Sequence, residues 1–266
     1  TAKFIPQMEP WFGTEEKEAM IKYMEEGGWL TEFNRTLEFE KRICDFTGSK
    51  HCIVVNNGTI SLTLMALAAG IGYGDEVIVP TNTYIATWLA ISQCGATPVP
   101  IEPDASSFTM NPILVEGAIT SKTKAIMIPN LLGNIPDWKE IRRICNKNNI
   151  IIIEDSADTL GYTINNTIQG KYSDIVTTSF NNEKFYNKAK LLRAWGRSSA
   201  IYNENENIEQ RFKKNEFNFD YDKKYIFTDF GYNFIPSEIS AAFGLEQLKK
   251  LSKNHSIRRI NFNLLL

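Results

Sequence analysis

The sequence contains few histidines and cysteines, the residues on which most metal centres and all disulfide frameworks depend. Its two histidines, His51 and His255, lie far apart in the chain, which argues against a multi-histidine metal centre. His51 precedes an apolar run and is interpreted as structural. The four cysteines are too scattered for a zinc knuckle and too few for a disulfide framework: Cys44, Cys52, Cys94 and Cys145. We therefore expect no metal site, and we expect the thiols to be reduced, as in a cytoplasmic protein.

Long apolar runs and an excess of charge of one sign are also missing. No window approaches the roughly 18 consecutive apolar residues that a membrane-spanning helix requires. The stretch TAKFIPQMEPWFGTEEK has no basic segment followed by an apolar one, so we expect no secretory signal in it. A formal net charge of −2 gives no electrostatic reason to bind nucleic acid or an anionic membrane. We expect a cytoplasmic protein that has neither of these as a partner.

The glycine-rich fingerprints of nucleotide-binding proteins are missing as well. The segment GIGYGDEV contains Gly70, Gly72 and Gly74, but it follows a helical pattern and precedes a strand pattern. A dinucleotide fingerprint needs the opposite order, so these glycines are predicted to lie in a connection. No GxxxxGK[ST] motif occurs. An unrelated nucleotide-binding α/β domain is thus disfavoured, although it stays an alternative.

What the sequence does contain is a regular alternation of short β-branched runs with longer helix-period segments. This pattern predicts a mainly parallel sheet with helices on both faces, an α/β fold of three layers. We expect an N-terminal helical segment over residues 1–30, a large α/β domain over 31–250, and over 251–266 the start of a further helix. The predicted strands are 52–56, 75–80, 97–101, 124–129, 149–154 and 173–180.

Three carboxylates follow one of these predicted strands, in the segment IIIEDSADTLGY (151–162). In an open parallel sheet, ligands bind beyond the carboxyl ends of the strands, and Asp155 lies at such an end. It either caps the next helix or holds a cationic group, because an unpaired buried carboxylate is costly. A protonated pyridine nitrogen is one such cation.

Other strand ends carry residues suited to a phosphate and a planar ring. Asn57, Gly58 and Thr59 stand between a strand pattern and a helix pattern, where free backbone N–H groups attract phosphate. Many such turns bind nothing, and this alternative stays open. Ser179 follows another strand and offers a hydroxyl. Tyr84 either covers the core or stacks on a planar ligand.

Taken together, these segments resemble the DegT/StrS sugar aminotransferase family, which uses vitamin B6 to modify nucleotide-linked keto sugars. The resemblance implies a fold-type I pyridoxal phosphate (PLP) enzyme that forms a homodimer with shared active sites. The motifs that carry it, in order, are NNGTISL, GDEVIVPTNTYIAT, GATPVPIEPDASSFTMNP, AIMIPNLLG, IIIEDSADTLG, DIVTTSF and GYNFIPSEISAAFGLEQLKKL.

The resemblance also implies roles for individual residues. Asp155 corresponds to the acid that pairs with the pyridine nitrogen, and Asp158 falls where the family has a residue near the ring hydroxyl. These two are the candidate catalytic residues, while Glu154 is interpreted as structural. The candidate cofactor-binding residues are Asn57, Gly58, Thr59, Tyr84, Asp155, Asp158, Ser179 and, reaching the phosphate of the partner subunit, Asn233.

The sequence departs from the family pattern after the SF pair, and the family's C-terminal domain has no counterpart in it. The family has its cofactor-bearing lysine shortly after the SF pair, followed by a Gly-rich segment, whereas here SF runs directly into NNEKFYNKAKLLRAWG. We interpret the loop that carries the lysine as missing and Lys184 as a surface residue. The polar segment 202–225 is predicted to be a long loop. The family's smaller C-terminal domain is expected to be absent or to lie outside this sequence.

The function expected from the resemblance is amino transfer to the keto group of a nucleotide-linked deoxy sugar, with glutamate as a suitable amino donor. Two alternatives stay open. NLLGN, Asp158 and RAWGR are similar to a subgroup that removes the 3-hydroxyl of a 4-keto-6-deoxy sugar; there a histidine replaces the lysine and the cofactor is pyridoxamine phosphate (PMP). The third possibility is an inactive homologue that binds sugar nucleotides. Cell-surface polysaccharide synthesis is the pathway class that the family implies.

Overall fold

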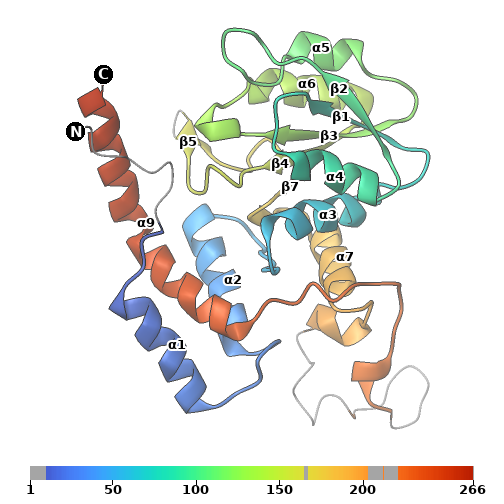
Figure 1. The fold of residues 1–266 in the computed structure, drawn as a ribbon. Coiled ribbons are helices and arrows are strands. Elements are labelled where there is room, and N and C mark those ends of the chain that lie inside the picture. The colour runs from blue at the N-terminus through green and yellow to red at the C-terminus, as the bar shows by residue number, and fades with distance from the viewer. Residues whose placement is uncertain (1–9, 165–166, 203–211, 213–220, 266) are drawn as a thin grey trace. The chain divides into compact units, whose positions relative to one another are not determined.

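The protein is described by a computed structural model, which covers residues 10–164, 167–202, 212 and 221–265. The helices are α1 (Thr14–Glu26), α2 (Asn34–Thr47), α3 (Gly58–Ala68), α4 (Ile85–Gln93), α5 (Pro112–Gly117), α6 (Trp138–Asn148), α7 (Glu183–Arg193) and α9 (Glu238–Leu265). The strands are β1 (Glu76–Pro80), β2 (Thr97–Ile101), β3 (Thr123–Pro129), β4 (Ile151–Asp155), β5 (Thr163–Ile164), β6 (Thr167–Ile168), β7 (Ile175–Val176) and β8 (Ser179–Phe180). Figure 1 shows their arrangement.

The chain divides into two compact units, one of residues 1–39 and 236–266 and the other of residues 40–235. In the smaller unit, the buried Glu16 of α1 forms an ion pair of 2.6 Å with Lys250 of α9. Glu238, at the start of α9, accepts hydrogen bonds from the first backbone N–H groups of α2. The domain boundaries expected near residues 30 and 250 stay a prediction; residue 250 lies within the continuous helix α9.

The larger unit is built on a six-stranded sheet with the order β2-β1-β3-β4-β7-β8. The first five strands in this order are parallel, and β8 is antiparallel to β7. Because β2 and β3 lie on opposite sides of β1, the chain reverses direction across the sheet between β1 and β3. In open α/β sheets this switch point is where ligands bind, beyond the carboxyl ends of the strands.

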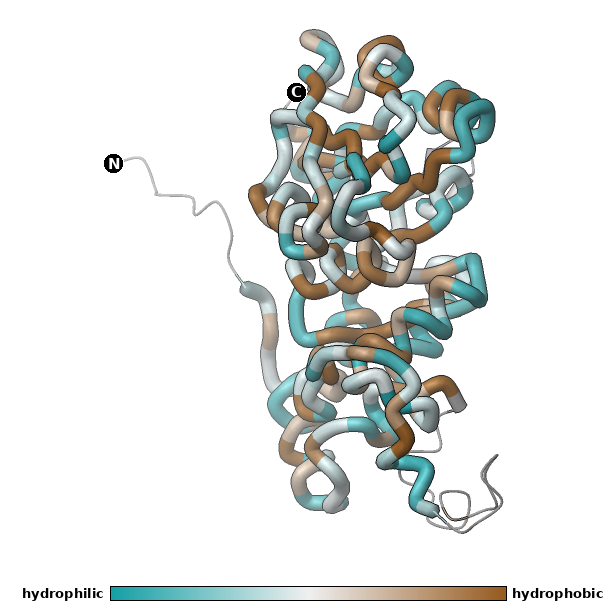
Figure 2. Tube along the Cα trace, turned by 90° about the vertical axis from the view of Figure 1, so that its right-hand side faces the viewer, coloured by the Kyte–Doolittle hydropathy of each residue, from teal (hydrophilic) through white to brown (hydrophobic). Residues whose placement is uncertain are grey.

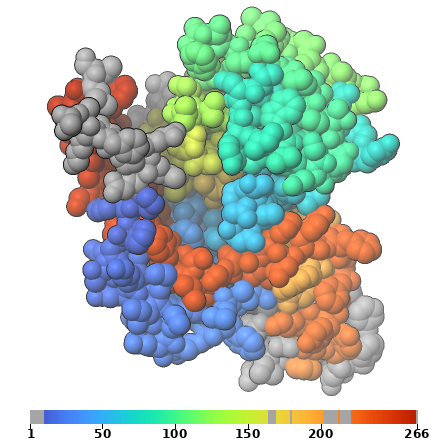
Figure 3. All heavy atoms as spheres, in the orientation of Figure 1, coloured from blue at the N-terminus to red at the C-terminus, as the bar shows by residue number. Residues whose placement is uncertain are grey.

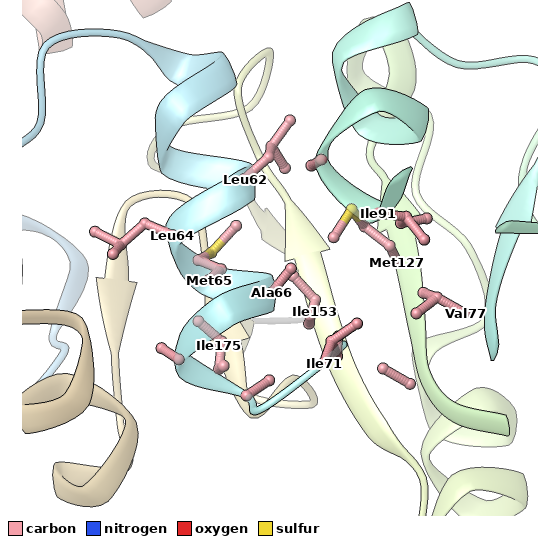
Figure 4. Packing of buried hydrophobic residues seen from close by; sticks show 14 of the residues in the cluster. Leu62, Leu64, Met65, Ala66, Ile71, Val77, Ile91, Met127, Ile153 and Ile175 are labelled. Atoms are coloured by element: carbon pink, nitrogen blue, oxygen red, sulfur yellow. The ribbon is translucent and has the colours of Figure 1, made fainter. Parts of the chain in front are cut away.

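Side chains alternate along β1, β3 and β4 between two apolar layers, and this is why helices cover both faces. Val77 of β1, Met127 of β3 and Ile153 of β4 pack in one layer with residues of α3, α4 and α7. Figure 4 shows Met127 beside Ile91 of α4. The strand residues between them pack in the opposite layer with α5 and α6. Strands buried on both faces favour continuous β-branched runs, which is the pattern in this sequence.

Two further views show the same part of the chain. Apolar and polar segments alternate along the coloured part of the Cα trace in Figure 2. In Figure 3 the neighbouring helices α3 and α4 lie side by side on the face toward the viewer. Within the described ranges, no helix is both long and apolar enough to cross a lipid bilayer.

Two predicted strands are wrong. Residues 52–56 form no strand; His51 makes only an isolated antiparallel bridge with Phe180 and stacks on Tyr186 at 4.3 Å. Residues 173–180 form a hairpin of β7 and β8 instead of one strand. The reason is that Thr177 and Thr178 turn the chain, so that β8 occupies the place beside β7 at the end of the sheet.

Two further predictions concern connections between elements. Gly70 and Gly74 do lie in the connection between α3 and β1, both with positive φ. Most of the segment 202–225, predicted to be a loop, lies outside the described residues.

A largely buried ion pair between Glu40 and Arg193 fixes the segment that leads into α3. Glu40 accepts hydrogen bonds from the N–H of Val54 and from Arg193, whose guanidinium also donates to the carbonyl of Val54. The side chains of Glu40 and Arg193 are only 10% and 11% exposed. An ion pair that removes its charges from water is costly to break at one end. Segment 54–57, which leads into α3, is therefore anchored between α2 and α7.

Candidate active site

A cavity of about 270 Å³ lies beyond the carboxyl ends of β1, β3 and β4, within the larger unit. It stands at the switch point of the sheet, where the fold alone predicts a ligand site. The residues that line it are Gly58, Thr59, Leu62, Thr83, Tyr84, Ala86, Pro129, Asn130, Leu131, Asp155, Ala157 and Asp158.

Asp155 is the buried acid of this cavity. It is the last residue of β4 and only 8% exposed. Its Oδ1 accepts a hydrogen bond of 3.2 Å from the N–H of Ala157, and its Oδ2 accepts one of 3.1 Å from the hydroxyl of Thr87 in α4. Burial raises the pKa of Asp155, and the nearby Asp158 and Glu154 raise it further, while both hydrogen bonds oppose the shift. A cation in the cavity would relieve this penalty.

Asp158 lies in the turn after β4 and is exposed. Its Oδ2 accepts a hydrogen bond of 3.0 Å from the N–H of Leu132, which has a positive φ of 53°. Asp158 thus ties the turn after β4 to the turn after β3. Since both turns border the cavity, this contact shapes one of its walls.

Glu154 points away from the cavity into a shell of hydrogen-bond donors, so the structure supports its interpretation as structural. It is 1% exposed, and five donors from three connections surround its carboxylate. A buried carboxylate is tolerated when its lone pairs are satisfied in this way. The donors are Asn130 Nδ2, Ser156 Oγ, Tyr162 O–H, the N–H of Gly170 and Ser173 Oγ.

The N-terminus of α3 forms another wall. Asn57 is its N-cap, and the side-chain oxygen of Asn57 accepts a hydrogen bond of 3.0 Å from the N–H of Ile60. Gly58 and Thr59 belong to the first helical turn, whose N–H groups lack intrahelical partners. A Cβ added to Gly58 would meet no heavy atom within 4 Å. The absence of a side chain therefore leaves open space beside backbone donors.

Tyr84 and Asn130 complete the site. Tyr84 directly precedes α4 and is 72% exposed, an unusual state for an aromatic residue next to a cavity. Asn130 is buried, and its Nδ2 donates to Glu154 and Ser156, so that its Oδ1 is directed elsewhere. Within the part of the chain that the structure describes, this Oδ1 has no hydrogen-bond partner.

Five of the predicted site residues come together around the cavity, although they are far apart in the sequence: Gly58, Thr59, Tyr84, Asp155 and Asp158. Two others are not among the described residues that line it. Asn57 acts as a helix cap, and Asn233 is exposed and forms a backbone bridge with Ala194. Ser179 belongs to β8, and its side chain lies outside the described part of the structure. Their proposed contacts with a phosphate stay predictions; the one for Asn233 concerns a partner subunit.

Sequence reasoning missed Thr87 and the role of Asn130. Thr87 follows Tyr84 by three residues, so helical spacing could have placed it one turn into α4. Its hydrogen bond to Asp155 spans 68 residues and leaves no signal in the sequence. No group of three or more His, Cys, Asp or Glu among the described residues is placed to hold a metal ion.

Fold and cavity together define an α/β domain in which a buried acid, an exposed aromatic residue and a helix N-terminus surround one cavity. The chain belongs to the DegT/DnrJ/EryC1/StrS aminotransferase family, whose model matches residues 12–265. The resemblance drawn from the motifs is therefore confirmed. So is the fold class, a mainly parallel three-layer α/β/α fold of the fold-type I PLP-dependent transferase kind.

The curated relatives of this chain are longer than the chain itself, so it matches only part of each. A dTDP-3-amino-3,6-dideoxy-α-D-galactopyranose transaminase of Aneurinibacillus thermoaerophilus is 43% identical over 164 residues, 62% of this chain and 45% of that protein. The chain spans between 45% and 61% of the length of the first three curated relatives that it matches.

Two solved structures extend the comparison. A GDP-4-keto-6-deoxymannose-3-dehydratase with bound GDP-perosamine has a TM-score of 0.82 and 26% identity, covering 97% of this chain and 71% of that one. NtdA of Bacillus subtilis with bound cofactor PMP has a TM-score of 0.73 and 27% identity, covering 90% of this chain and 54% of that one.

Proposed function

We propose that this chain binds a vitamin B6 phosphate, PLP or PMP, and takes part in amino transfer to the keto group of a nucleotide-linked deoxy sugar. The observation that carries the proposal is Asp155, a buried carboxylate that opens onto a cavity between an exposed aromatic face and a helix N-terminus. The names of the similar transaminase and of the PMP-bound structure support the same chemistry.

The residues of the cavity fit such a group in three respects. Asp155 matches a protonated pyridine nitrogen, Tyr84 offers a face for the planar ring, and the backbone N–H groups of Gly58 and Thr59 suit the phosphate. When bound, a vitamin B6 phosphate supplies an electron sink and carries the amino group. Asp155 would hold the proton on the ring nitrogen, since its carboxylate is stabilised by that positive charge.

Asp158 has a different part in this proposal. Its Oδ2 is engaged by the N–H of Leu132, while its position on the cavity wall allows Oδ1 to accept a proton from a bound group. It is thus the exposed acid of the pair, suited to proton transfer, whereas Asp155 is the buried one that holds a charge.

The remaining parts of the proposal rest on the family. Glutamate as amino donor, a homodimer with active sites completed by Asn233 of a second copy, and a cytoplasmic location are expectations that the described residues do not address. Removal of the 3-hydroxyl is a second candidate, favoured by the similarity to a 3-dehydratase over 97% of this chain.

A single half-reaction tests the proposal. The protein is loaded with PMP, mixed with a dTDP-linked or a GDP-linked 4-keto-6-deoxy sugar, and the products are analysed by mass spectrometry. Amino transfer predicts an amino sugar and one equivalent of PLP, seen by its visible absorbance. Loss of the 3-hydroxyl without nitrogen in the sugar would favour the second candidate. Absence of PMP binding would overturn both and leave an inactive homologue.

Gly58→Ala is expected to affect stability and binding in opposite directions. Gly58 has no positive φ and no neighbour that a Cβ would strike, so alanine should stabilise the helix, by roughly 0.4–1 kcal/mol. The same methyl group would fill the space beside the backbone donors, and the affinity for PMP should fall about tenfold. Fluorescence titration and thermal unfolding measure the two effects. Gly117→Ala, also in open space but away from the cavity, is the matched control, and equal affinities in both variants would contradict the assignment.

A further inference from the structure

The charged groups nearest to Asp155 are carboxylates. Asp158 shares the cavity wall with it, and Glu154 is its neighbour in β4. Burial raises the pKa of Asp155 first of all, and these two carboxylates raise it further. The helices that border the cavity, α3 and α4, contain no charged residue. Among the described residues of the wall, an ionised Asp155 thus depends on hydrogen-bond donors.

Two donors hold the two oxygens of this carboxylate. The N–H of Ala157 donates to Oδ1 at 3.2 Å, and the hydroxyl of Thr87 donates to Oδ2 at 3.1 Å. Both hydrogen bonds favour the charged form and lower the pKa of Asp155. The donor of Ala157 belongs to the backbone, so any residue except proline would supply it. Thr87 is therefore the donor that depends on the choice of side chain.

A second hydroxyl stands behind that of Thr87. Thr83 lies four residues earlier, just before α4, and its Oγ1 is 2.9 Å from the Oγ1 of Thr87. A hydroxyl has one proton to donate and two lone pairs that accept. Because the proton of Thr87 is committed to the ionised Asp155, the Thr87 oxygen accepts and Thr83 donates. Both O–H groups therefore point along one path, from Thr83 through Thr87 to Asp155.

This path leads from the cavity wall into the interior. Thr83 is half-buried and lines the cavity, whereas Thr87 is fully buried. A threonine within a helix ordinarily donates to a backbone carbonyl of the preceding turn, as Thr63 does to the carbonyl of Thr59. Thr87 donates across to β4 instead. Hydrogen bonds in series polarise one another in a low-dielectric interior, so Thr83 strengthens the bond that Asp155 receives.

We propose that Thr83 and Thr87 are positioning residues, a relay of two hydroxyls that keeps Asp155 ionised and oriented toward a cation in the cavity. The inference rests on the proposed function, in which this cation is the protonated ring nitrogen of a vitamin B6 phosphate. Neither hydroxyl gives up its proton; each acts through Asp155. With both of its oxygens fixed, the carboxylate is ready before a ligand arrives and has no proton to lose on binding.

The first test needs no ligand. The carboxyl carbons of aspartate are labelled with carbon-13 in the intact protein, and the resonance of Asp155 is identified by its loss in Asp155→Asn. Valine has the shape of threonine without the donor. We therefore expect the pH midpoint of this resonance to be higher in Thr87→Val by about one pH unit, a tenfold gain in proton affinity. Thr87→Ser, which keeps the hydroxyl, should restore the midpoint, and Thr83→Val should raise it by a smaller amount.

The matched control is Thr47→Val. Thr47 is 1% exposed, and its hydroxyl bonds only to neutral groups, the carbonyl of Ile43 at 2.8 Å and the hydroxyl of Ser49 at 3.0 Å. Its loss can lower the free energy of unfolding but should leave the midpoint of Asp155 unchanged. An unchanged or lower midpoint in Thr87→Val would overturn the inference. Should that variant not fold, an unchanged midpoint in Thr83→Val, at a half-buried position, overturns it equally.

Binding of PMP separates failure of the relay from failure of the proposed function. In fluorescence titrations, the loss of PMP affinity on acidification should begin at a higher pH in Thr87→Val than in Thr87→Ser. Tight PMP binding together with an unchanged midpoint keeps the proposed function and overturns the relay. A raised midpoint in a protein that binds no PMP keeps the relay and overturns the proposed function.

Discussion

Replacing Asp155 by asparagine is expected to leave the fold intact and to slow the half-reaction with PMP by about a hundred- to a thousandfold. A neutral amide cannot stabilise the proton on a pyridine nitrogen, so the ring loses much of its capacity to draw electrons. The fold should persist because the amide oxygen can still accept a hydrogen bond from the N–H of Ala157, while the amide nitrogen can donate to the hydroxyl oxygen of Thr87. Removing a buried carboxylate whose pKa burial has raised also removes an electrostatic cost.

The control for Asp155 is Asp137→Asn, the same loss of charge outside the cavity. Asp137 caps α6 by accepting a hydrogen bond of 3.1 Å from the N–H of Glu140, and asparagine caps helices about as well as aspartate. We expect its rate to match that of the unaltered protein. The measurement is the appearance of PLP absorbance in single-turnover experiments. Full activity of Asp155→Asn would refute the proposed role of Asp155.

The pH dependence of binding gives an independent readout for Asp155. Because its pKa is raised, the free carboxyl takes up a proton at a higher pH than an ordinary aspartate. Below that pKa the neutral acid cannot pair with a pyridinium, so the affinity for PMP should fall on acidification. The fall should begin above the usual value of about 3.9. In Asp155→Asn this contribution to the pH dependence should be lost.

Replacing Gly196 by alanine is expected to lower the free energy of unfolding by at least about 4 kcal/mol, an exceptional loss for one methyl group. Gly196 has a φ of +83°, and a Cβ there would stand 1.9 Å from the carbonyl oxygen of Asp229. Two backbone segments cross at this point, since a Cβ on Gly231 would stand 2.3 Å from the nitrogen of Gly196. The atoms in the way belong to the backbone, so no side chain can move aside.

A second glycine separates the effect of φ from that of the close approach. Gly74 has a φ of +90° but no heavy atom within 4 Å of an added Cβ. Gly74→Ala should therefore cost only the left-handed conformation, about 1–2 kcal/mol. Urea unfolding followed by circular dichroism compares the two variants. Equal losses would show that the crossing at Gly196 can relax, contrary to our expectation.

The amino-acid sequence by itself determined the class of fold and the acid at the centre of the site. Continuous apolar, β-branched runs predict β1, β3 and β4 because strands buried on both faces need apolar residues at every position. Asp155 was found for the same reason: a carboxylate directly after such a run must lie at the carboxyl edge of the sheet. Tyr84, just past the end of β1, follows from the same topological rule.

Only the tertiary structure decided how β7 and β8 pair and which donors Asp155 has. The run SDIVTTSF reads as one strand because its composition suits a strand throughout. Whether Thr177 and Thr178 turn depends on the free place beside β7, a property of the sheet and not of the segment. The contact of Thr87 with Asp155 likewise depends on how α4 packs. Local patterns record which residues are buried, whereas pairing between distant segments is set by packing that no single segment encodes.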